Sequence, residues 1–308
     1  MKWKTYINQW NRSSIWVKLL VAFIVFVVLR LLLIENNQRE SFISTDEQFV
    51  YHKGDKIYDD FYANVYDLLV YNKIKNQYEF SEFVQSTKPT RSSYILDIGS
   101  GTGHHVNMMN KKGFKAVGLE KSKDMLKLAR KNYPDCQYDY GDTMDGMLYT
   151  SSSFTHITCF YFTIYYIQNK EAFFRNCFKW LMPGGYLVVH LVDRANFSPI
   201  LEAGDQLSLI SPQKYAKKRI TSTYVKFDDY DYKSNFRLDD KRDKGYMDEY
   251  FVDKTKEKAL KNEHELFMPT QKTILGMAKQ AGFILKSKID MVEVEYEYQY
   301  LYVLQKPN

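Results

Sequence analysis

A turn with three glycines at residues 97–103 has the residue types and spacing of a cofactor-binding loop. It reads DIGSGTG, and a short apolar run at 94–98 leads into it. Glycines let the backbone bend sharply and allow a ligand to come close to the main chain. The helix expected after the turn offers free N–H groups and the positive end of its dipole. These features together predict a site for an adenosine-containing cofactor.

A carboxylate follows at the end of the next apolar run. Glu120 lies about 20 residues beyond the turn, where it could accept hydrogen bonds from both ribose hydroxyls. A dinucleotide site needs the pattern GxGxxG, but His104 or Val106 stands where the third glycine is required. The acid Asp97 before the turn suits a cation and not a pyrophosphate. S-adenosylmethionine (SAM), which carries an ammonium and a sulfonium, fits these residues better than NAD(P).

Several segments, in order along the chain, resemble the motifs of class I SAM-dependent methyltransferases. They are LDIGSGTG at 96–103, the acidic ribose loop at 117–125, YDYGD at 138–142, LMPGG at 181–185 and the stretch at 262–283, with 58–69 similar to an N-terminal lid helix. The resemblance covers about residues 55–305. It implies an α/β fold of the Rossmann-like class I type, a mostly parallel seven-stranded sheet with a reversed last strand, and SAM as cofactor.

The resemblance also implies which residues contact SAM. The methionine end would lie against the glycine turn, and Glu120 would hold the ribose. The adenine would lie near Met125 and Asp142. Cys159 and Phe160, at the end of the fourth strand, would border the methyl group. The full expected set is Asp97, Gly99, Ser100, Gly101, Gly103, Glu120, Met125, Asp142, Thr143, Cys159 and Phe160.

No catalytic base can be named from the sequence. A base is needed only where the accepting atom carries a proton. His190, inside the apolar run before Asp193, and Tyr161, directly after the fourth strand, are the candidates. A histidine within an apolar strand is also typical of a buried core, so that alternative stays open. His104 and His105 open a helix, which favours packing or solvent contact, and no metal site is predicted.

An apolar segment near the N-terminus predicts a membrane-spanning helix. Residues 15–34 read IWVKLLVAFIVFVVLRLLLI. A helix of about 20 residues spans roughly 30 Å, the thickness of the hydrocarbon layer of a membrane. Lys18 and Arg30 each lie about one turn from an end, so both could reach the headgroups. We therefore expect a tail at 1–14, a transmembrane helix at 15–34 and a polar linker at 35–54.

Two arguments about the orientation in the membrane conflict. Basic residues are more frequent before the apolar centre than after it, which favours a cytoplasmic N-terminus. A SAM enzyme, however, needs cytosolic SAM, and three sparse cysteines fit a reducing compartment. We give the cofactor more weight. The sequence thus predicts a single-pass membrane protein whose catalytic domain faces the cytosol.

The remaining chain, 55–308, reads as one methyltransferase domain. Helical spacing at 55–86 precedes strands that alternate with helices up to residue 192, which predicts a parallel sheet covered by helices on both faces. Apolar and polar residues alternate within 205–266, which predicts an antiparallel insertion. The insertion follows the fifth strand of the sheet, where it could cover the substrate.

Three functions fit these patterns. The first is a membrane-anchored methyltransferase whose acceptor, a small or lipid-like molecule or a protein near the membrane, is not identified by the sequence. The second is a non-catalytic scaffold that binds a partner through 205–266. The third is an NAD(P)-dependent oxidoreductase. A net charge of +6 with interleaved acids and bases gives no strong signal for nucleic-acid binding.

Overall fold

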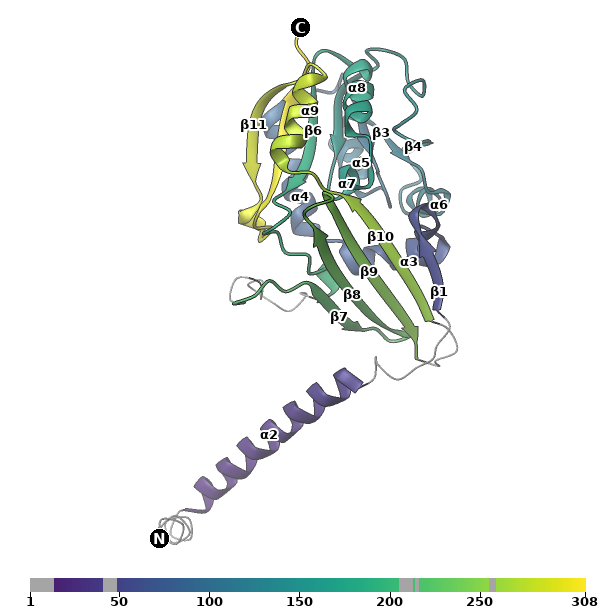
Figure 1. Cartoon of the computed structure of the whole chain (residues 1–308). Helices are drawn as coiled ribbons and strands as arrows, with labels where there is room; N and C mark the ends of the chain where they lie inside the picture. Colours follow the sequence, from purple (N-terminus) through teal and green to yellow (C-terminus); the bar gives the residue numbers. More distant parts are fainter. Residues whose placement is uncertain (1–13, 41–48, 205–212, 214–215, 255–258) are drawn as a thin grey trace. The chain divides into compact units, whose positions relative to one another are not determined.

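The apolar run at 94–98 forms an inner strand of a seven-stranded sheet. The computed structural model describes residues 14–40, 49–204, 213, 216–254 and 259–308 (Figure 1). Its strand order is β11-β12-β6-β5-β2-β3-β4. β12 runs antiparallel to β6, so the predicted reversed last strand is confirmed. The bounds are β2 (Tyr94–Ile98), β3 (Lys115–Glu120), β4 (Gln137–Tyr140), β5 (Phe154–Cys159), β6 (Leu181–Val192), β11 (Ile284–Asp290) and β12 (Gln299–Gln305).

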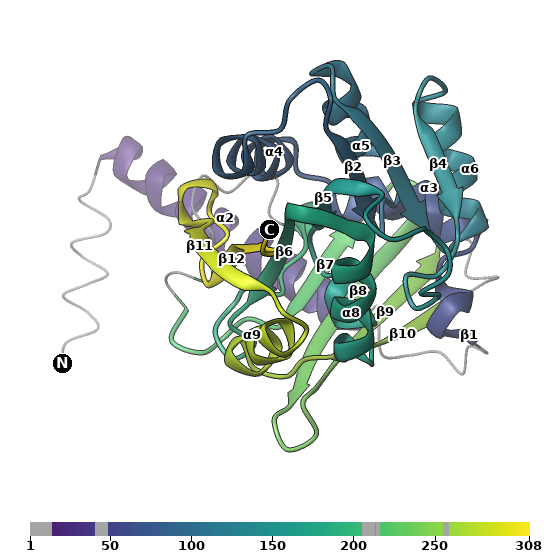
Figure 2. The ribbon, with the colours of Figure 1, turned by 90° about the horizontal axis from the view of Figure 1, so that it is seen from above.

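Helices cover both faces of this sheet. Figure 2 shows α8 (Lys170–Trp180) and α9 (Gln271–Gln280) on one face. On the other face lie α4 (Lys73–Thr87), α5 (His104–Lys111) and α6 (Lys123–Asn132). Each face of the sheet has its own apolar core, as expected for strands that are buried on both sides. The Rossmann-like arrangement implied by the sequence is therefore present.

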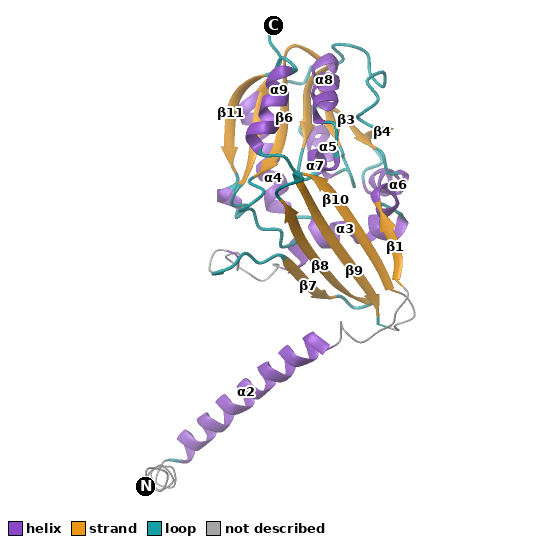
Figure 3. Cartoon of the chain, in the orientation of Figure 1, coloured by secondary structure: helices purple, strands orange, loops and turns teal. Residues whose placement is uncertain are grey.

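A second sheet is built mainly from the insertion after β6. Its order is β1-β10-β9-β8-β7, and the pairs among β7 to β10 are antiparallel, as the alternating pattern predicts. Residues 205–212, 214–215 and 255–258 of the predicted insertion lie outside the described residues. The strands, coloured orange in Figure 3, are β7 (Ser222–Lys226), β8 (Tyr230–Asp239), β9 (Lys244–Asp253) and β10 (Ala259–Phe267).

The polar linker expected at 35–54 contains a strand. β1 (Phe49–Lys53) pairs parallel to β10, and 41–48 lie outside the described residues. Five residues of mixed polarity carry little strand signal, and the pairing partner is about 200 residues away in the chain, so local pattern could not reveal it. After β1 comes the short helix η1 (Gly54–Ile57).

Two helices, α3 (Asp60–Val70) and α4, follow η1 in the chain. α3 begins where the Asp59 side chain accepts a hydrogen bond from the Tyr62 amide at 2.9 Å. Asn72 caps α4 in the same way. α3 buries its apolar side against the inner face of the insertion sheet, where Tyr62, Val65, Leu69, Tyr232 and Phe251 form a third core. The two helices expected within 55–86 are thus confirmed.

The N-terminal residues form a unit of their own, Met1–Gln48, and the second unit is Phe49–Asn308. Helix α2 (Ile15–Glu40) covers and extends the predicted span at 15–34. Its side chains are described as far as Val27, and residues 1–13 lie outside the described part. No helix within the described part of the chain is long and apolar enough to cross a membrane, so the predicted span is not confirmed.

Candidate functional site

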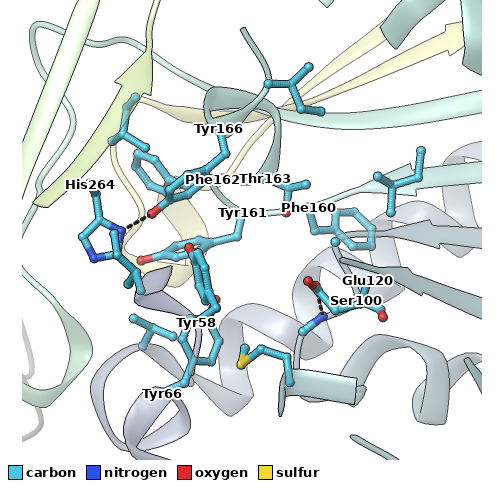
Figure 4. Close-up of a pocket in the computed structure, with 18 of the residues that line it drawn as sticks. Tyr58, Tyr66, Ser100, Glu120, Phe160, Tyr161, Phe162, Thr163, Tyr166 and His264 are labelled. Carbon is cyan, nitrogen blue, oxygen red and sulfur yellow. Dashed lines mark hydrogen bonds between the residues drawn. The ribbon is translucent and has the colours of Figure 1, made fainter. Parts of the chain in front are cut away.

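One cavity of about 410 Å³ lies between the carboxyl ends of the central strands and the inner face of the insertion sheet (Figure 4). Ligand pockets commonly enclose about 300–1,000 Å³. Residues 97–102 at the end of β2, Glu120 at the end of β3 and Phe160 after β5 line one part of it. Tyr58, tyrosines of α3 and inward side chains of β9 and β10 line the other. Open α/β sheets bind ligands at this edge.

The glycine turn needs its glycines for two physical reasons. Gly99 and Gly101 have φ of +68° and +53°, a region that side chains with Cβ rarely adopt. A Cβ on Gly99 would also lie 2.5 Å from Thr163 Cγ2, so the close packing of β2 against α7 (Thr163–Tyr166) depends on its absence. The Gly99 and Ser100 amides donate to the Leu119 carbonyl at 2.8 and 3.2 Å, which ties the turn to β3.

Glu120 binds the turn from the neighbouring strand. Its Oε2 accepts from the Gly101 amide at 3.1 Å, and its Oε1 accepts from the Lys121 and Ser122 amides at 2.8 and 2.9 Å. Burial raises the pKa of Glu120, while these three N–H groups act in the opposite direction. The carboxylate is thereby fixed in the cavity wall, where Oε2 retains capacity for further donors such as ribose hydroxyls.

Asp97 lies deeper in the same wall. It is only 3% exposed, and its Oδ1 accepts from the Thr158 hydroxyl at 2.7 Å. Burial raises the pKa of this carboxyl group, which means that the site around it gains from a cationic ligand. The ammonium and the sulfonium of SAM are such cations.

Two buried hydroxyl groups without a hydrogen-bond partner indicate whether an adenosyl ligand fits the cavity. Ser100 Oγ and Thr143 Oγ1 are buried without a hydrogen-bond partner among the described residues, and both side chains line the cavity. A buried polar atom without a partner costs free energy, so such atoms call for a polar ligand. Together with Asp97 and Glu120 they fit SAM. When bound, SAM supplies an activated methyl group on its sulfonium.

The structure brings most of the predicted site residues to this cavity, with three exceptions. Gly103 begins α5 with φ +89°, and a Cβ there would collide with the Tyr138 hydroxyl. Cys159 is fully buried in the apolar core beneath the wall, and burial raises the pKa of its thiol. His190 is the third. The residues in the wall are Asp97, Gly99, Ser100, Gly101, Glu120, Met125, Asp142, Thr143, Phe160 and Tyr161.

His190 is a core histidine and does not reach the cavity. Its side chain is fully buried, with Nδ1 3.2 Å from Glu79 Oε1 and Nε2 3.1 Å from Gln299 Oε1. Asp193 likewise faces its own loop, where it accepts from the Ala195 amide at 3.1 Å. The candidate role of His190 in substrate contact therefore has no support in the geometry. Tyr161, the other candidate, lines the cavity with φ +50°.

The buried carboxylate of Glu79 links α4 to α5 and to β6 of the central sheet. Glu79 of α4 lies 3.3 Å from Lys75 Nζ and 3.1 Å from His105 Nε2, besides its contact with His190. Burial opposes ionisation, but the charge of Lys75 and the two histidine contacts hold the pKa of Glu79 well below its usual value. His105 therefore has a packing role, as its position at the start of α5 favours.

The sequence predicted that the insertion could cover the substrate, but it did not identify the residues that line this half of the cavity. Its wall contains tyrosines from α3, from α7 and from the residues just before α3, together with a histidine–carboxylate pair from the insertion. Figure 4 labels Tyr58, Tyr66, Tyr166 and His264. His264 and Glu249 occupy inward positions of β10 and β9, and each is 1% exposed. Alternation along each strand shows that one face is buried, but it does not show which polar side chains share the buried face. The tyrosines are Tyr58, Tyr62, Tyr66 and Tyr166.

Residues 95–185 match a protein family described as a methyltransferase domain. The chain is similar to dTDP-3-amino-3,4,6-trideoxy-alpha-D-glucopyranose N,N-dimethyltransferase of Streptomyces venezuelae, with 32% identity over 140 residues, or 43% of this chain and 58% of that protein. It is also similar to phosphoethanolamine N-methyltransferase 1 of Zea mays, with 28% identity over 35% of this chain and 22% of that protein. The chain spans about half the length of the amino-sugar relatives it matches.

Solved structures share the fold. The CcbJ methyltransferase of Streptomyces caelestis has a TM-score of 0.62 and 16% identity, over 82% of this chain and 99% of that one. The sugar N-methyltransferase KedS8 of Streptoalloteichus sp has a TM-score of 0.59 and 19% identity, over 86% of this chain and 99% of that one. The matched segment contains the glycine turn, Glu120 and Asp142. Residues 95–185 therefore match a methyltransferase domain, and the side chains that they contribute to the cavity fit SAM.

Proposed function

We propose that the chain transfers the methyl group of SAM to the nitrogen of a small amine bound beneath the insertion sheet. One observation carries the proposal. A single cavity joins the glycine turn and Glu120 to a set of tyrosine rings around the His264–Glu249 pair. Cofactor and acceptor can therefore meet in one enclosed space, which an in-line displacement at the methyl carbon requires.

The acceptor half has the chemistry of an ammonium site. Tyrosine faces attract cations, and here Tyr58, Tyr66 and Tyr166 surround the space. The buried carboxylate of Glu249 adds a negative charge to the same wall. The names of the amino-sugar and phosphoethanolamine relatives also specify methyl transfer to nitrogen. A small amine, such as an amino sugar, fits this wall better than a lipid chain or a nucleic acid.

A transfer assay with labelled SAM tests the acceptor class. We expect the full chain to label the nitrogen of phosphoethanolamine or of a dTDP-3-amino-3,6-dideoxyglucose probe. It should leave their hydroxyl counterparts, 2-hydroxyethyl phosphate and dTDP-6-deoxyglucose, without label. Label that appears on the hydroxyl compounds, or only in lipid or protein fractions of a cell extract, would overturn the amine proposal. Turnover on any of them would exclude the non-catalytic scaffold.

We further propose that residues 15–34 anchor the chain in a membrane, with the methyltransferase domain on the cytosolic side. The support is the apolar composition of the segment and the exposed large side chains of α2, such as Ile15, Leu20 and Phe23. We expect the full chain to stay in the membrane pellet at alkaline pH and a chain without residues 1–48 to be released. Protection of residues 49–308 from protease in sealed, cytosol-side-out vesicles would contradict the orientation.

A further inference from the structure

Methyl transfer to an amine requires a lone pair on nitrogen, and an ammonium ion has none. At neutral pH a primary amine is mostly protonated, as the side chain of lysine is. The proton must therefore leave before or during the transfer. This inference rests on the proposed function and concerns the groups that take this proton.

A chain of three side chains leads from the cavity into the insertion sheet. The Tyr166 hydroxyl lies 2.8 Å from His264 Nδ1, the contact marked in Figure 4. His264 Nε2 lies 2.7 Å from Glu249 Oε2. All three residues line the cavity. They come from α7, β10 and β9, so no local sequence motif connects them.

The partners of Glu249 determine the direction of each hydrogen bond. Its Oε1 accepts from the Tyr62 and Tyr232 hydroxyls at 3.2 and 2.6 Å. Although burial opposes ionisation, the positive charge that His264 can carry and the hydrogen bonds from His264, Tyr232 and Tyr62 lower the pKa of Glu249, so it is a carboxylate. A carboxylate can only accept, so His264 Nε2 is the donor in this contact. When the imidazole is neutral, Nδ1 is the acceptor and Tyr166 donates to it.

The Tyr166 oxygen also accepts a hydrogen bond from the Tyr58 hydroxyl, and its remaining lone pair can accept from a ligand. We propose that Tyr166 takes the proton of the acceptor ammonium while its own phenolic proton passes to His264 Nδ1. One N–H bond of the amine and the O–H bond of Tyr166 break, and a new O–H bond and an Nδ1–H bond form. The freed amine attacks the methyl carbon, and the sulfur keeps the electron pair of the broken C–S bond. The imidazolium forms beside Glu249, which compensates its charge.

The other titratable groups around Tyr166 and His264 do not compete for this proton. Burial raises the pKa of Tyr166 and of each neighbouring tyrosine, so all are neutral phenols at physiological pH. Tyr166 therefore acts as a relay and not as a stored phenolate. The only carboxylate bound to His264 within the described residues is that of Glu249. The neighbouring phenols are those of Tyr58, Tyr62, Tyr66, Tyr161 and Tyr232.

The first test needs no acceptor. Selective ¹⁵N-histidine labelling of the full chain, with His264→Gln used for assignment, reports which ring nitrogen carries the proton. We expect Nε2–H in the wild type. In Glu249→Gln the side-chain amide would donate to Nε2, so the proton should move to Nδ1. Nδ1–H in the wild type would overturn the relay, because Tyr166 would then have no acceptor.

The second test follows the rate against pH with phosphoethanolamine or the amino-sugar probe. For Tyr166→Phe and His264→Gln we expect kcat at neutral pH to fall by about 10²–10⁴, with KM for SAM little changed. The difference in kcat between the variants and the wild type should become smaller above the pKa of the amine, because the amine is then already deprotonated. His52→Gln, a histidine of the same sheet outside the cavity wall, should match the wild type.

The outcomes separate the relay from the proposed function. If the variants lose a constant factor at every pH, the three side chains have a structural role only and the relay is wrong, while amine methylation stands. If the wild type binds S-adenosylhomocysteine but methylates no amine, the proposed acceptor class fails, and the relay fails with it.

Discussion

At the scale of single residues, Glu120 explains how one carboxylate serves both the fold and the ligand. Three backbone N–H groups from two loops fix it in the cavity wall. The Gly101 and Ser122 amides are partly buried, so Glu120 supplies an acceptor that these donors would otherwise lack. The same geometry presents Oε2 to the space where a ribose would lie.

The substitution Glu120→Gln tests this double role. The amide nitrogen would face backbone donors, and one hydrogen bond to the ribose would lose its charge. We expect the affinity for S-adenosylhomocysteine, measured by calorimetry, to fall by at least about tenfold, which corresponds to about 1.4 kcal/mol. Glu171→Gln, an exposed carboxylate at the start of α8, is the matched control and should bind normally. Equal affinity in the two variants would refute the ribose assignment.

His156 makes the fold sensitive to acid. Burial lowers its pKa to about 4, with the Thr87 carbonyl acting weakly against this. An unfolded chain binds the proton already near pH 6.5, so the free energy of unfolding falls as the pH drops from 6.5 towards 4. At pH 5 the loss amounts to about 2 kcal/mol relative to pH 7.5.

Urea unfolding at pH 7.5 and pH 5 measures this loss. His156→Phe keeps a ring against Tyr186, which stacks on the histidine at 5.8 Å between ring centroids, but it cannot bind a proton. The variant should therefore lose about 2 kcal/mol less than the wild type between the two pH values. An equal loss in both proteins would show that other groups cause the acid sensitivity.

At the scale of elements, replacing glycine by alanine should have opposite effects on stability at two positions. Gly276 is an exposed helical residue of α9, and a Cβ there meets nothing within 4 Å. Gly276→Ala should stabilise the chain by about 0.5–1 kcal/mol. In β3, a Cβ on Gly118 would lie 2.5 Å from Ser100 Oγ and 2.8 Å from Tyr138 Cδ1. Gly118→Ala should destabilise by about 1–3 kcal/mol.

Thermal unfolding of the two variants without cofactor gives the comparison. The Gly118→Ala variant should also bind S-adenosylhomocysteine more weakly, because Ser100 belongs to the cofactor turn. If Gly118→Ala left both stability and binding unchanged, the close packing of β3 against that turn would be wrong.

The elements of the central sheet could be predicted because each carries a local signal. Short apolar runs end at glycine turns or acids, and helices begin at side-chain caps such as Asn72 and Ser122. β1 could not be predicted, because its pairing with β10 is a contact between distant parts of the chain. The short helix α7 has no clear signal either, because its four residues lie within a run rich in aromatic side chains.

The two halves of the site also differ in how far the sequence predicts them. The cofactor half follows from one turn and two strand ends, so Asp97, Glu120 and Asp142 were predictable. The acceptor half depends on the register of antiparallel strands, which places Glu249 beside His264 although 15 positions separate them. His190 was misjudged as a candidate because an apolar strand hides whether its histidine faces the cavity or, as here, Glu79.

At the scale of the unit Phe49–Asn308, two sheets and the helix α3 line one cavity. α3 packs on the insertion sheet, and Tyr66 also approaches the cofactor turn, 4.0 Å from where a Cβ of Gly101 would lie. A ligand in the cofactor half should therefore hold α3 in place. α9, on the outer face of the central sheet, has no such contact with the cavity.

Amide hydrogen exchange tests this coupling. Saturating S-adenosylhomocysteine should slow exchange in α3 by several-fold or more, because local opening must then release the ligand. Exchange in α9 should change far less. A uniform change in both helices would show only global stabilisation, and no change in α3 would mean that this helix does not cover the cofactor.

Equilibrium binding tests the central claim most directly, that the turn at 97–103 and Glu120 bind SAM. Calorimetric titration of the full chain with SAM, S-adenosylhomocysteine and NAD⁺ separates the candidate cofactors in one series. The account predicts one site per chain for both adenosyl sulfur compounds and no saturable binding of NAD⁺. Binding of NAD⁺ alone, or no binding of SAM and S-adenosylhomocysteine, would contradict it.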